Sequence, residues 1–205
     1  MEIVQLFQAG GTFMYPILLV LAIGLAISIE RFIYLTKVQS KTNTVWSELT
    51  PMLQALDFQR AARFTAEIKT PLANVLNFGF IRQQEDKSRE VIEASMEEGI
   101  MDEMPKLTQR THYLATFANI ATLLGLLGTI IGLIQAFTAV AQADPAEKAD
   151  LLSASISVAM NTTAFGLIAA IPLLLMHSYL VTKTAHLVDS IEKSSLKALN
   201  LMVRD

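Results

Sequence analysis

The sequence predicts an all-α membrane protein with three transmembrane helices, and three observations lead to this prediction. Apolar residues make up 52% of the 205 residues and charged residues only 17%, whereas soluble domains carry about 25% charged residues. Three stretches contain no Asp, Glu, Lys or Arg, and they run over residues 3–29, 111–143 and 151–182. A helix needs about 20 mostly apolar residues to cross a bilayer, so each stretch is long enough for one span.

The chain is predicted to begin with a periplasmic segment, residues 1–12, followed by a first transmembrane helix, residues 13–29. We expect this helix to be a retained anchor rather than a signal peptide. No basic residue precedes it, and Glu30-Arg31 follows it without a small-residue cleavage site.

Residues 30–112 predict a cytoplasmic helical domain, because apolar residues recur there at helical spacing in several runs. Pro51 is expected in the first turns of one helix, and Asp57 is expected to cap the start of the next. A later run predicts a solvated acidic helix face, made by Glu93, Glu97, Glu98, Asp102 and Glu103.

The second and third transmembrane helices are predicted over residues 113–141 and 154–182, joined by a periplasmic hairpin at 142–153. Residues 183–205 predict a cytoplasmic amphipathic helix, whose apolar residues recur at Leu187, Val188, Ile191, Leu196 and Leu199. Such a helix contacts another subunit or packs on its own chain, and the pattern leaves both interpretations open.

Lysine and arginine predict the orientation, because they gather on the cytoplasmic side of a membrane. Residues 1–29 carry none, residues 30–112 carry eleven, the hairpin carries only Lys148, and the segment after the third span carries four. We therefore expect a multi-pass membrane protein whose N-terminus lies outside and whose C-terminus lies on the cytoplasmic side.

Several function classes are disfavoured. A net charge of −3 argues against nucleic-acid binding through a broad basic face. The absence of cysteine excludes a thiolate metal site and a cysteine nucleophile. The three histidines lack metal-ligand spacing, and no nucleophile-elbow or phosphate-loop motif is present. We therefore expect neither an enzyme nor a bound cofactor.

Spans two and three carry polar residues that lipid-facing helices do not need. Thr129 and Thr163 are expected near mid-bilayer on faces of small residues, where their oxygens suit water or Na⁺. The candidate ion-pathway residues are Thr129, Thr163, Thr162, Asn161, Thr122 and Asn119, and the candidate Na⁺ ligands are Thr162 and Thr163.

Small residues in the same spans predict close helix packing. The candidate packing residues are Gly125, Gly128, Gly132, Gly166 and Pro172. Gly166 belongs to a stripe of small residues along the third span, Ser155, Ala159, Thr163, Gly166 and Ala170. Pro172 is expected to disturb the helix and free a carbonyl. The alternative interpretation is that glycines and hydroxyls only hold the helices together, without transport.

None of the three spans contains a carboxylate. An ion path driven by the membrane potential usually needs an ionisable group inside the membrane. If this chain conducts ions, another polypeptide must supply that group.

Two of these stretches resemble the MotA/TolQ/ExbB proton channel family. Residues 124–137, LGLLGTIIGLIQAF, are similar to its second span, and residues 161–172, NTTAFGLIAAIP, are similar to its third span. The Glu30-Arg31 pair, the three spans and the large cytoplasmic insertion also fit. The span count resembles ExbB and TolQ rather than the four-span flagellar stators.

The resemblance implies a homo-oligomeric ring, a pentamer, around two copies of a single-span ExbD/TolR-like partner that supplies an Asp. Flow of H⁺ or Na⁺ past that Asp would drive rotation or a conformational cycle and transmit force to a TonB- or TolA-like protein across the periplasm. It further implies that Thr129 and Thr163 face the partner's Asp, that Gly125, Gly128 and Gly166 permit close packing, and that Pro172 shapes the span.

Two positions depart from the family pattern. Many ExbB and TolQ chains have Glu five residues before the third-span threonine, where this chain has Val158, and Thr162 stands where ExbB-like chains often have Ala. The Thr162-Thr163 pair resembles the sodium-driven stators. More oxygens without an acid favour Na⁺ over H⁺, with H⁺ left open.

Two other functions compete with that of an ion-driven motor. A non-conducting membrane scaffold for envelope machinery would use the polar stripe only for helix packing. A self-contained secondary transporter is disfavoured, because the sequence contains no inverted repeat and no charge within a span.

Overall fold

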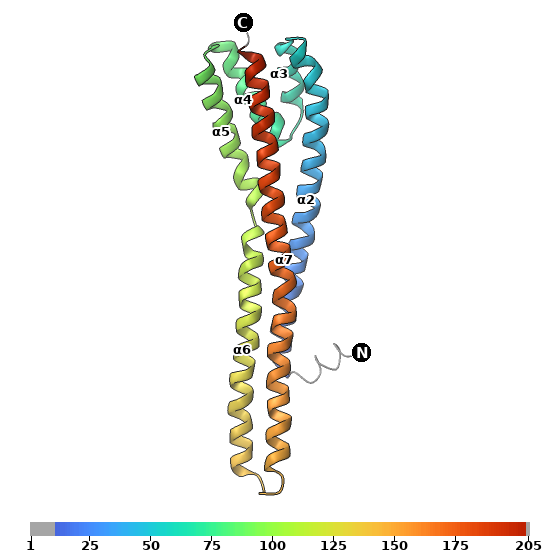
Figure 1. The fold of residues 1–205 in the computed structure, drawn as a ribbon, viewed down its shortest axis with the longest axis vertical. Coiled ribbons are helices and arrows are strands. Elements are labelled where there is room, and N and C mark those ends of the chain that lie inside the picture. The colour runs from blue at the N-terminus through green and yellow to red at the C-terminus, as the bar shows by residue number, and fades with distance from the viewer. Residues whose placement is uncertain (1–10, 204–205) are drawn as a thin grey trace. The chain divides into compact units, whose positions relative to one another are not determined.

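The computed structural model describes residues 11–203, and over these residues the chain forms helices and no strand (Figure 1). The all-α prediction is therefore confirmed for this part of the chain. The helices are α2 (Met14–Gln54), α3 (Phe58–Glu67), α4 (Pro71–Glu85), α5 (Arg89–Thr108), α6 (Thr111–Gln142) and α7 (Lys148–Met202). Residues 1–10 of the predicted periplasmic segment and residues 204–205 of the predicted C-terminal segment lie outside the described residues.

Contacts divide the chain into two compact units. Unit 1 comprises Met1–Glu30 and Arg110–Tyr179, and unit 2 comprises Arg31–Gln109 and Leu180–Asp205. Helices α2 and α7 contribute residues to both units.

Unit 1 consists of the α6–α7 hairpin and the first part of α2. Residues 143–147 join α6 to α7, and Glu147 N–H donates to the Asp144 carbonyl at 3.0 Å within this turn. The core of the unit is apolar, and its largest members include Met14, Ile17, Phe165 and Leu173. Small core residues such as Ala118, Ala121 and Ala169 allow the helices to approach closely.

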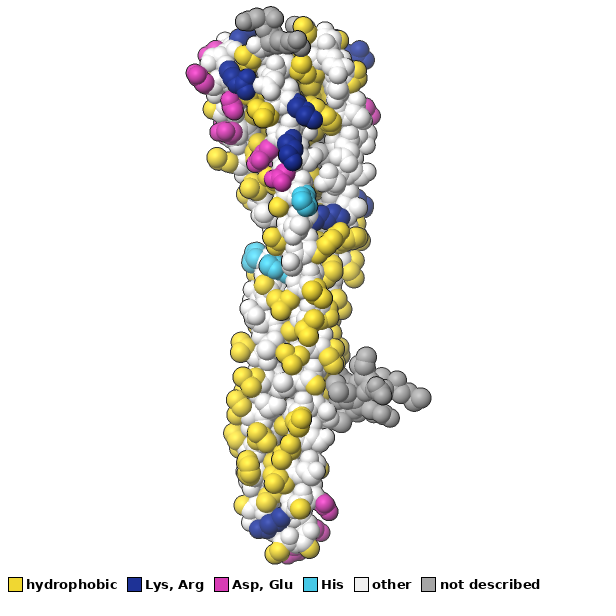
Figure 2. Space-filling view, viewed as in Figure 1, with side chains coloured by type: hydrophobic (Ala, Val, Ile, Leu, Met, Phe, Trp, Pro, Cys, Tyr) yellow, Lys and Arg dark blue, Asp and Glu magenta, His cyan; other side chains and the backbone are white. Residues whose placement is uncertain are grey.

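The surface of unit 1 is also apolar. Leu123, Ile134, Phe137 and Leu175 are each at least 60% exposed, and Figure 2 shows hydrophobic side chains covering the visible face of this hairpin. Soluble monomers rarely expose contiguous apolar surface of this extent.

Three helical segments are long and apolar enough to cross a membrane. They lie in Met14–Gln54, in Arg89–Gln142 and in Lys148–Met202, which confirms the prediction of three spans. Their limits in the bilayer, and the division into periplasmic and cytoplasmic segments, stay predictions.

Unit 2 contains the short helices α3, α4 and α5. The Asp57 carboxylate accepts a hydrogen bond from Arg60 N–H at 3.1 Å and caps α3, as the sequence predicts. The expectation for Pro51 is wrong, because α2 continues to Gln54 and places Pro51 in its last turn. There Leu56 adopts a positive φ of 57° just beyond the helix end.

Arg31 is the largest fully buried side chain of the described residues. Its guanidinium donates to the carbonyls of Lys106 at 3.2 Å and Leu107 at 2.6 Å in the last turn of α5, and it lies 4.6 Å from the centroid of the Tyr34 ring. A cation at this position satisfies carbonyls that the helix itself leaves unpaired.

The predicted amphipathic segment is part of α7. Leu187, Val188, Ile191 and Leu199 are buried within unit 2, whereas Leu196 is 49% exposed. Four of the five predicted apolar positions therefore pack on their own chain, and Leu196 is free to contact another molecule.

Candidate ion pathway

Helices α6 and α7 of unit 1 touch backbone to backbone at Gly125 and Gly166. A Cβ atom on Gly125 would lie 3.2 Å from Thr163 Cα and 3.3 Å from Gly166 Cα. A Cβ atom on Gly166 would lie only 2.8 Å from the Ala121 carbonyl oxygen. The predicted packing role of these two glycines therefore has a direct steric basis.

Thr163 joins the two helices at the same level. Its hydroxyl donates to the Gly125 carbonyl oxygen at 2.9 Å. Since that proton is committed, the hydroxyl oxygen retains acceptor capacity for a water molecule, a donor or a cation.

Thr162 has different surroundings. It is 2% exposed, its hydroxyl donates to the Val158 carbonyl at 3.0 Å, and its methyl group contacts the position that a Cβ atom on Gly128 would take. Consecutive residues of an α-helix point about 100° apart. The hydroxyls of Thr162 and Thr163 therefore do not converge on one point within a subunit.

Two candidate threonines share one face of α6. Thr122 and Thr129 are seven residues apart, which places them about 20° from each other around the helix and about 10 Å along it. Thr122 donates to the Ala118 carbonyl at 3.1 Å, and Thr129 donates to the Leu126 carbonyl at 2.6 Å. Both hydroxyls thus keep acceptor capacity on the same side.

The two candidate asparagines are less well aligned with this face. Asn119 is exposed on α6, about 60° around the helix from Thr122. Asn161 is half-buried on α7, about 160° around the helix from Thr163. Asn161 therefore does not share the Thr163 face.

The remaining packing residues behave differently from one another. A Cβ atom on Gly132 would lie 3.0 Å from Ala159 Cβ, so this pair continues the α6–α7 contact. Pro172 is exposed, and α7 continues through it from Lys148 to Met202. The proline removes one backbone donor without ending the helix.

Charged residues flank the end of the α6–α7 hairpin at which α6 begins, next to Arg110. Arg110 has a positive φ of 62° immediately before α6, and its guanidinium lies 3.7 Å from the Glu30 carboxylate. The exposed side chains of this pair make it a weak contact.

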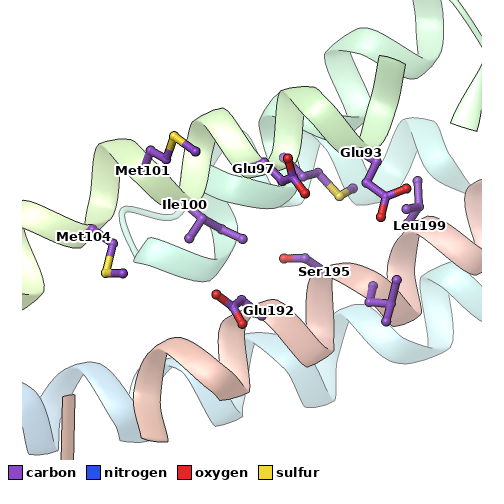
Figure 3. A pocket seen from close by; sticks show the side chains of 10 residues that line it. Glu93, Glu97, Ile100, Met101, Met104, Glu192, Ser195 and Leu199 are labelled. Carbon is purple, nitrogen blue, oxygen red and sulfur yellow. The ribbon is translucent and has the colours of Figure 1, made fainter. Parts of the chain in front are cut away.

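Unit 2 holds an acidic groove between α5 and α7, with a volume of about 560 Å³. Figure 3 shows Glu93, Glu97 and Glu192 around this space, with Met101, Met104 and Leu199 beside it. Within residues 11–203, no group of three His, Cys, Asp or Glu side chains is placed to hold a metal ion.

One carboxylate of the predicted acidic face is not solvated. The side chain of Glu103 is only 8% exposed, accepts a hydrogen bond from the Asn74 amide at 2.8 Å and pairs with Lys106 at 2.5 Å. The prediction of a solvated face is therefore wrong at Glu103, because α4 packs against this side of α5.

Two features escaped the sequence analysis. In the sequence Arg31 marks only the end of the first charge-free stretch, and its buried contacts are with residues of α5 that lie 75 and 76 positions away. Four lysines from separate parts of the chain, Lys37, Lys41, Lys69 and Lys106, line one cavity of unit 2. No spacing in the sequence brings them together.

The chain is similar to known proteins over most of its length. The model of the MotA/TolQ/ExbB proton channel family matches residues 67–193. The chain is 28% identical over 196 residues to a putative biopolymer transport protein ExbB homolog of Methanothermobacter thermautotrophicus, covering 93% of this chain and 67% of the relative. It is 26% identical over 169 residues to the putative ExbB-like protein 3 of Synechocystis, covering 82% of this chain and 80% of the relative.

A shorter similarity falls on a Tol protein. The chain is 36% identical over 78 residues to the Tol-Pal system protein TolQ of Haemophilus influenzae, covering 38% of this chain and 34% of that protein. The family is one of channel and transport proteins rather than enzymes. Its match over residues 67–193, together with three apolar helices, shows that this multi-pass membrane protein belongs to the MotA/TolQ/ExbB proton channel family.

Proposed function

We propose that this chain is the ion-conducting ring subunit of an inner-membrane motor, and that five copies surround a single-span ExbD/TolR-like partner whose Asp completes the path. The observation that carries the proposal is the set of threonine oxygens with free acceptor capacity, Thr122, Thr129 and Thr163, in two spans that contain no charged residue. The motor would transmit force to a TonB- or TolA-like protein.

The hydrogen bonds support this role for the three threonines. Each hydroxyl proton points to a backbone carbonyl, so each oxygen is held in an orientation in which it accepts rather than donates. Acceptors suit a path for Na⁺, or for water that carries H⁺. Negative charge for attracting the ion must then come from the partner's Asp.

The choice of ion depends on how many oxygens can meet it. Thr162 and Thr163 do not converge within a subunit, so a Na⁺ ion at Thr163 would need further oxygens from a neighbouring subunit or from the partner. We still favour Na⁺, because no carboxylate in the spans offers a proton relay and Val158 stands at the position of the family's glutamate.

The scaffold function is favoured by a specific observation of its own. Thr163 donates to the Gly125 carbonyl where the backbones of α6 and α7 touch, so its hydroxyl has a packing role without any ion. A scaffold predicts that removal of this hydroxyl weakens assembly and leaves no flux to lose.

Flux into proteoliposomes that hold this protein with its single-span partner tests the proposal, under a Na⁺ gradient and separately under a pH gradient. A hydrogen bond to a charged group is worth about 1.5–3 kcal/mol, so Thr163→Val should lower flux by about ten- to a hundredfold. Thr163→Ser keeps the hydroxyl and should retain most of the flux.

Thr138→Val is the matched control. Thr138 is an exposed threonine on α6 whose hydroxyl donates to the Ile134 carbonyl at 2.8 Å, and it is outside the proposed path. Normal flux in Thr163→Val would remove the role that we give Thr163. Dispersed rings in that variant would support the scaffold.

A further inference from the structure

A cavity of about 600 Å³ in unit 2 is lined by lysines. It lies between α2, the start of α4 and the end of α5, and the lysines are Lys37, Lys41, Lys69 and Lys106. A second hollow of about 500 Å³ shares Lys41, Lys69 and Thr70 with it, so the two form one groove, which we call the lysine groove.

The charges of the lysine groove are not balanced. Glu103 pairs with Lys106 and is held by Asn74, which leaves Lys106 neutralised. Lys37, Lys41 and Lys69 take part in no ion pair with the described residues. Over both hollows four lysines face three glutamates, because Glu48 and Glu67 line the second hollow. The first hollow holds all four lysines and only Glu103, so the net positive charge is concentrated there.

The start of helix α4 adds to this charge. Thr70 and Pro71 line the groove, and α4 begins at Pro71 with Thr70 as its N-cap. Thr70 Oγ1 accepts from Ala73 N–H at 3.3 Å and keeps its own proton for donation. The positive end of a helix dipole favours an anion, and phosphate groups above all.

The groove begins at the depth of the headgroup layer of a bilayer and extends beyond it, because Lys37 and Lys41 lie about 6 Å and about 12 Å along α2 from Ile33. Exposed large apolar side chains on α2 end at Phe32 and Ile33, and the next one along the chain is Leu56. Lys37 follows Ile33 by four residues, which is about 6 Å along a helix. Each headgroup layer is about 5–7 Å thick, and a lysine side chain reaches further by extending along an apolar surface.

We propose that the lysine groove binds the phosphate of an anionic phospholipid from the adjoining leaflet. The lysines supply positive charge, and the start of α4 supplies the helix dipole. The exposed apolar residues of α2 that precede Lys37, among them Phe32 and Ile33, meet the acyl chains. The proposal rests on the membrane placement of α2 and does not require ion conduction. Lipid titration without any ion gradient therefore tests it independently of the proposed function.

The full-length protein in detergent is titrated with dioctanoyl phosphatidylglycerol and, separately, with dioctanoyl phosphatidylcholine, and bound lipid is counted by native mass spectrometry. The groove variant is Lys37→Gln/Lys41→Gln/Lys69→Gln. The control variant Lys87→Gln/Lys193→Gln/Lys197→Gln removes the same charge from exposed positions outside the groove. Circular dichroism confirms that each variant keeps its helix content.

Each lysine near an anionic headgroup contributes a factor of about five in affinity, so the groove variant should bind phosphatidylglycerol about a hundredfold more weakly and lose its preference over phosphatidylcholine. The control variant should change by less than about twofold. Equal losses in the two variants would overturn the proposal. Displacement of the lipid by inorganic phosphate at about 10 mM, a concentration that fills a site of millimolar affinity, would instead assign the groove to a soluble anion. Loss of oligomers with unchanged lipid binding would assign it to a protein contact.

Discussion

Replacing Gly166 with alanine tests the α6–α7 contact most directly. The new Cβ would lie 2.8 Å from the Ala121 carbonyl oxygen and 3.0 Å from Gly125 Cα. Both are backbone atoms of α6, so no side-chain rotation relieves the overlap. The two helices must therefore separate, and the hydrogen bond from Thr163 to the Gly125 carbonyl must lengthen with them.

The expected cost has two parts. Inserting a methyl group into a well-packed contact costs about 1–3 kcal/mol. An interhelical hydrogen bond within a membrane contributes about 0.6 kcal/mol on average. Alanine is favoured over glycine in a helix interior by about 0.5–1 kcal/mol, which offsets part of this cost. We therefore expect Gly166→Ala to lower the free energy of unfolding by about 1–3 kcal/mol.

The assay is reversible unfolding in mixed detergent micelles, followed by circular dichroism, with Gly132→Ala as the graded control. A Cβ on Gly132 meets the Ala159 Cβ at 3.0 Å, an overlap that a shift of a few tenths of an ångström removes. The helix preference of alanine offsets part of the cost, so we expect a net cost below about 1 kcal/mol. Gly166→Ala and Thr163→Val should also be non-additive, because the first change already disrupts the bond that the second removes. A Gly166→Ala protein as stable as wild type, or strict additivity, would refute the geometry described for this contact.

Two smaller predictions concern unit 2, and hydrogen exchange of the local backbone measures both. Leu56→Gly should stabilise the end of α2 by about 0.5–1 kcal/mol, because Leu56 has a φ of 57° and a left-handed conformation strains residues with a Cβ; faster exchange after this change would contradict the strain. Asp57→Ala should destabilise α3 by about 1 kcal/mol, because it removes the acceptor of the Arg60 N–H, whereas Asp57→Asn should restore most of the loss. Unchanged exchange in Asp57→Ala would show that the cap does not stabilise α3.

The features that the sequence predicts correctly depend on residues that are close together in the chain. The charge-free stretches locate the apolar part of each long helix, because a charged side chain in lipid is costly and is therefore rare within a span. Asp57 caps α3 because a short acidic side chain before a helical run satisfies a free backbone N–H. Both signals lie within a few residues of the feature that they predict.

The failures depend on contacts between distant residues. The sequence predicts Pro51 near a helix start, because proline favours first turns, but the last turn of α2 also tolerates it. The sequence predicts Glu103 on a solvated face, yet Asn74 of α4 packs against this carboxylate and donates a hydrogen bond to it. Thr162 and Thr163 look equivalent in sequence. In the structure the Thr162 methyl group packs against Gly128, whereas the Thr163 hydroxyl donates to the Gly125 carbonyl. This difference depends on where the two glycines lie on α6.

The packing and conduction functions of Thr163 are linked by the same geometry. Its hydroxyl proton is directed to the Gly125 carbonyl only because two glycines bring α6 and α7 into backbone contact. That hydrogen bond in turn fixes where the acceptor lone pairs of the oxygen point. If Thr163 lines the ion path, then separating the helices reorients an oxygen of the path without removing it. Gly166→Ala should therefore lower flux although no polar atom is lost, and its effect should shrink in a Thr163→Val background, where there is no hydroxyl left to orient.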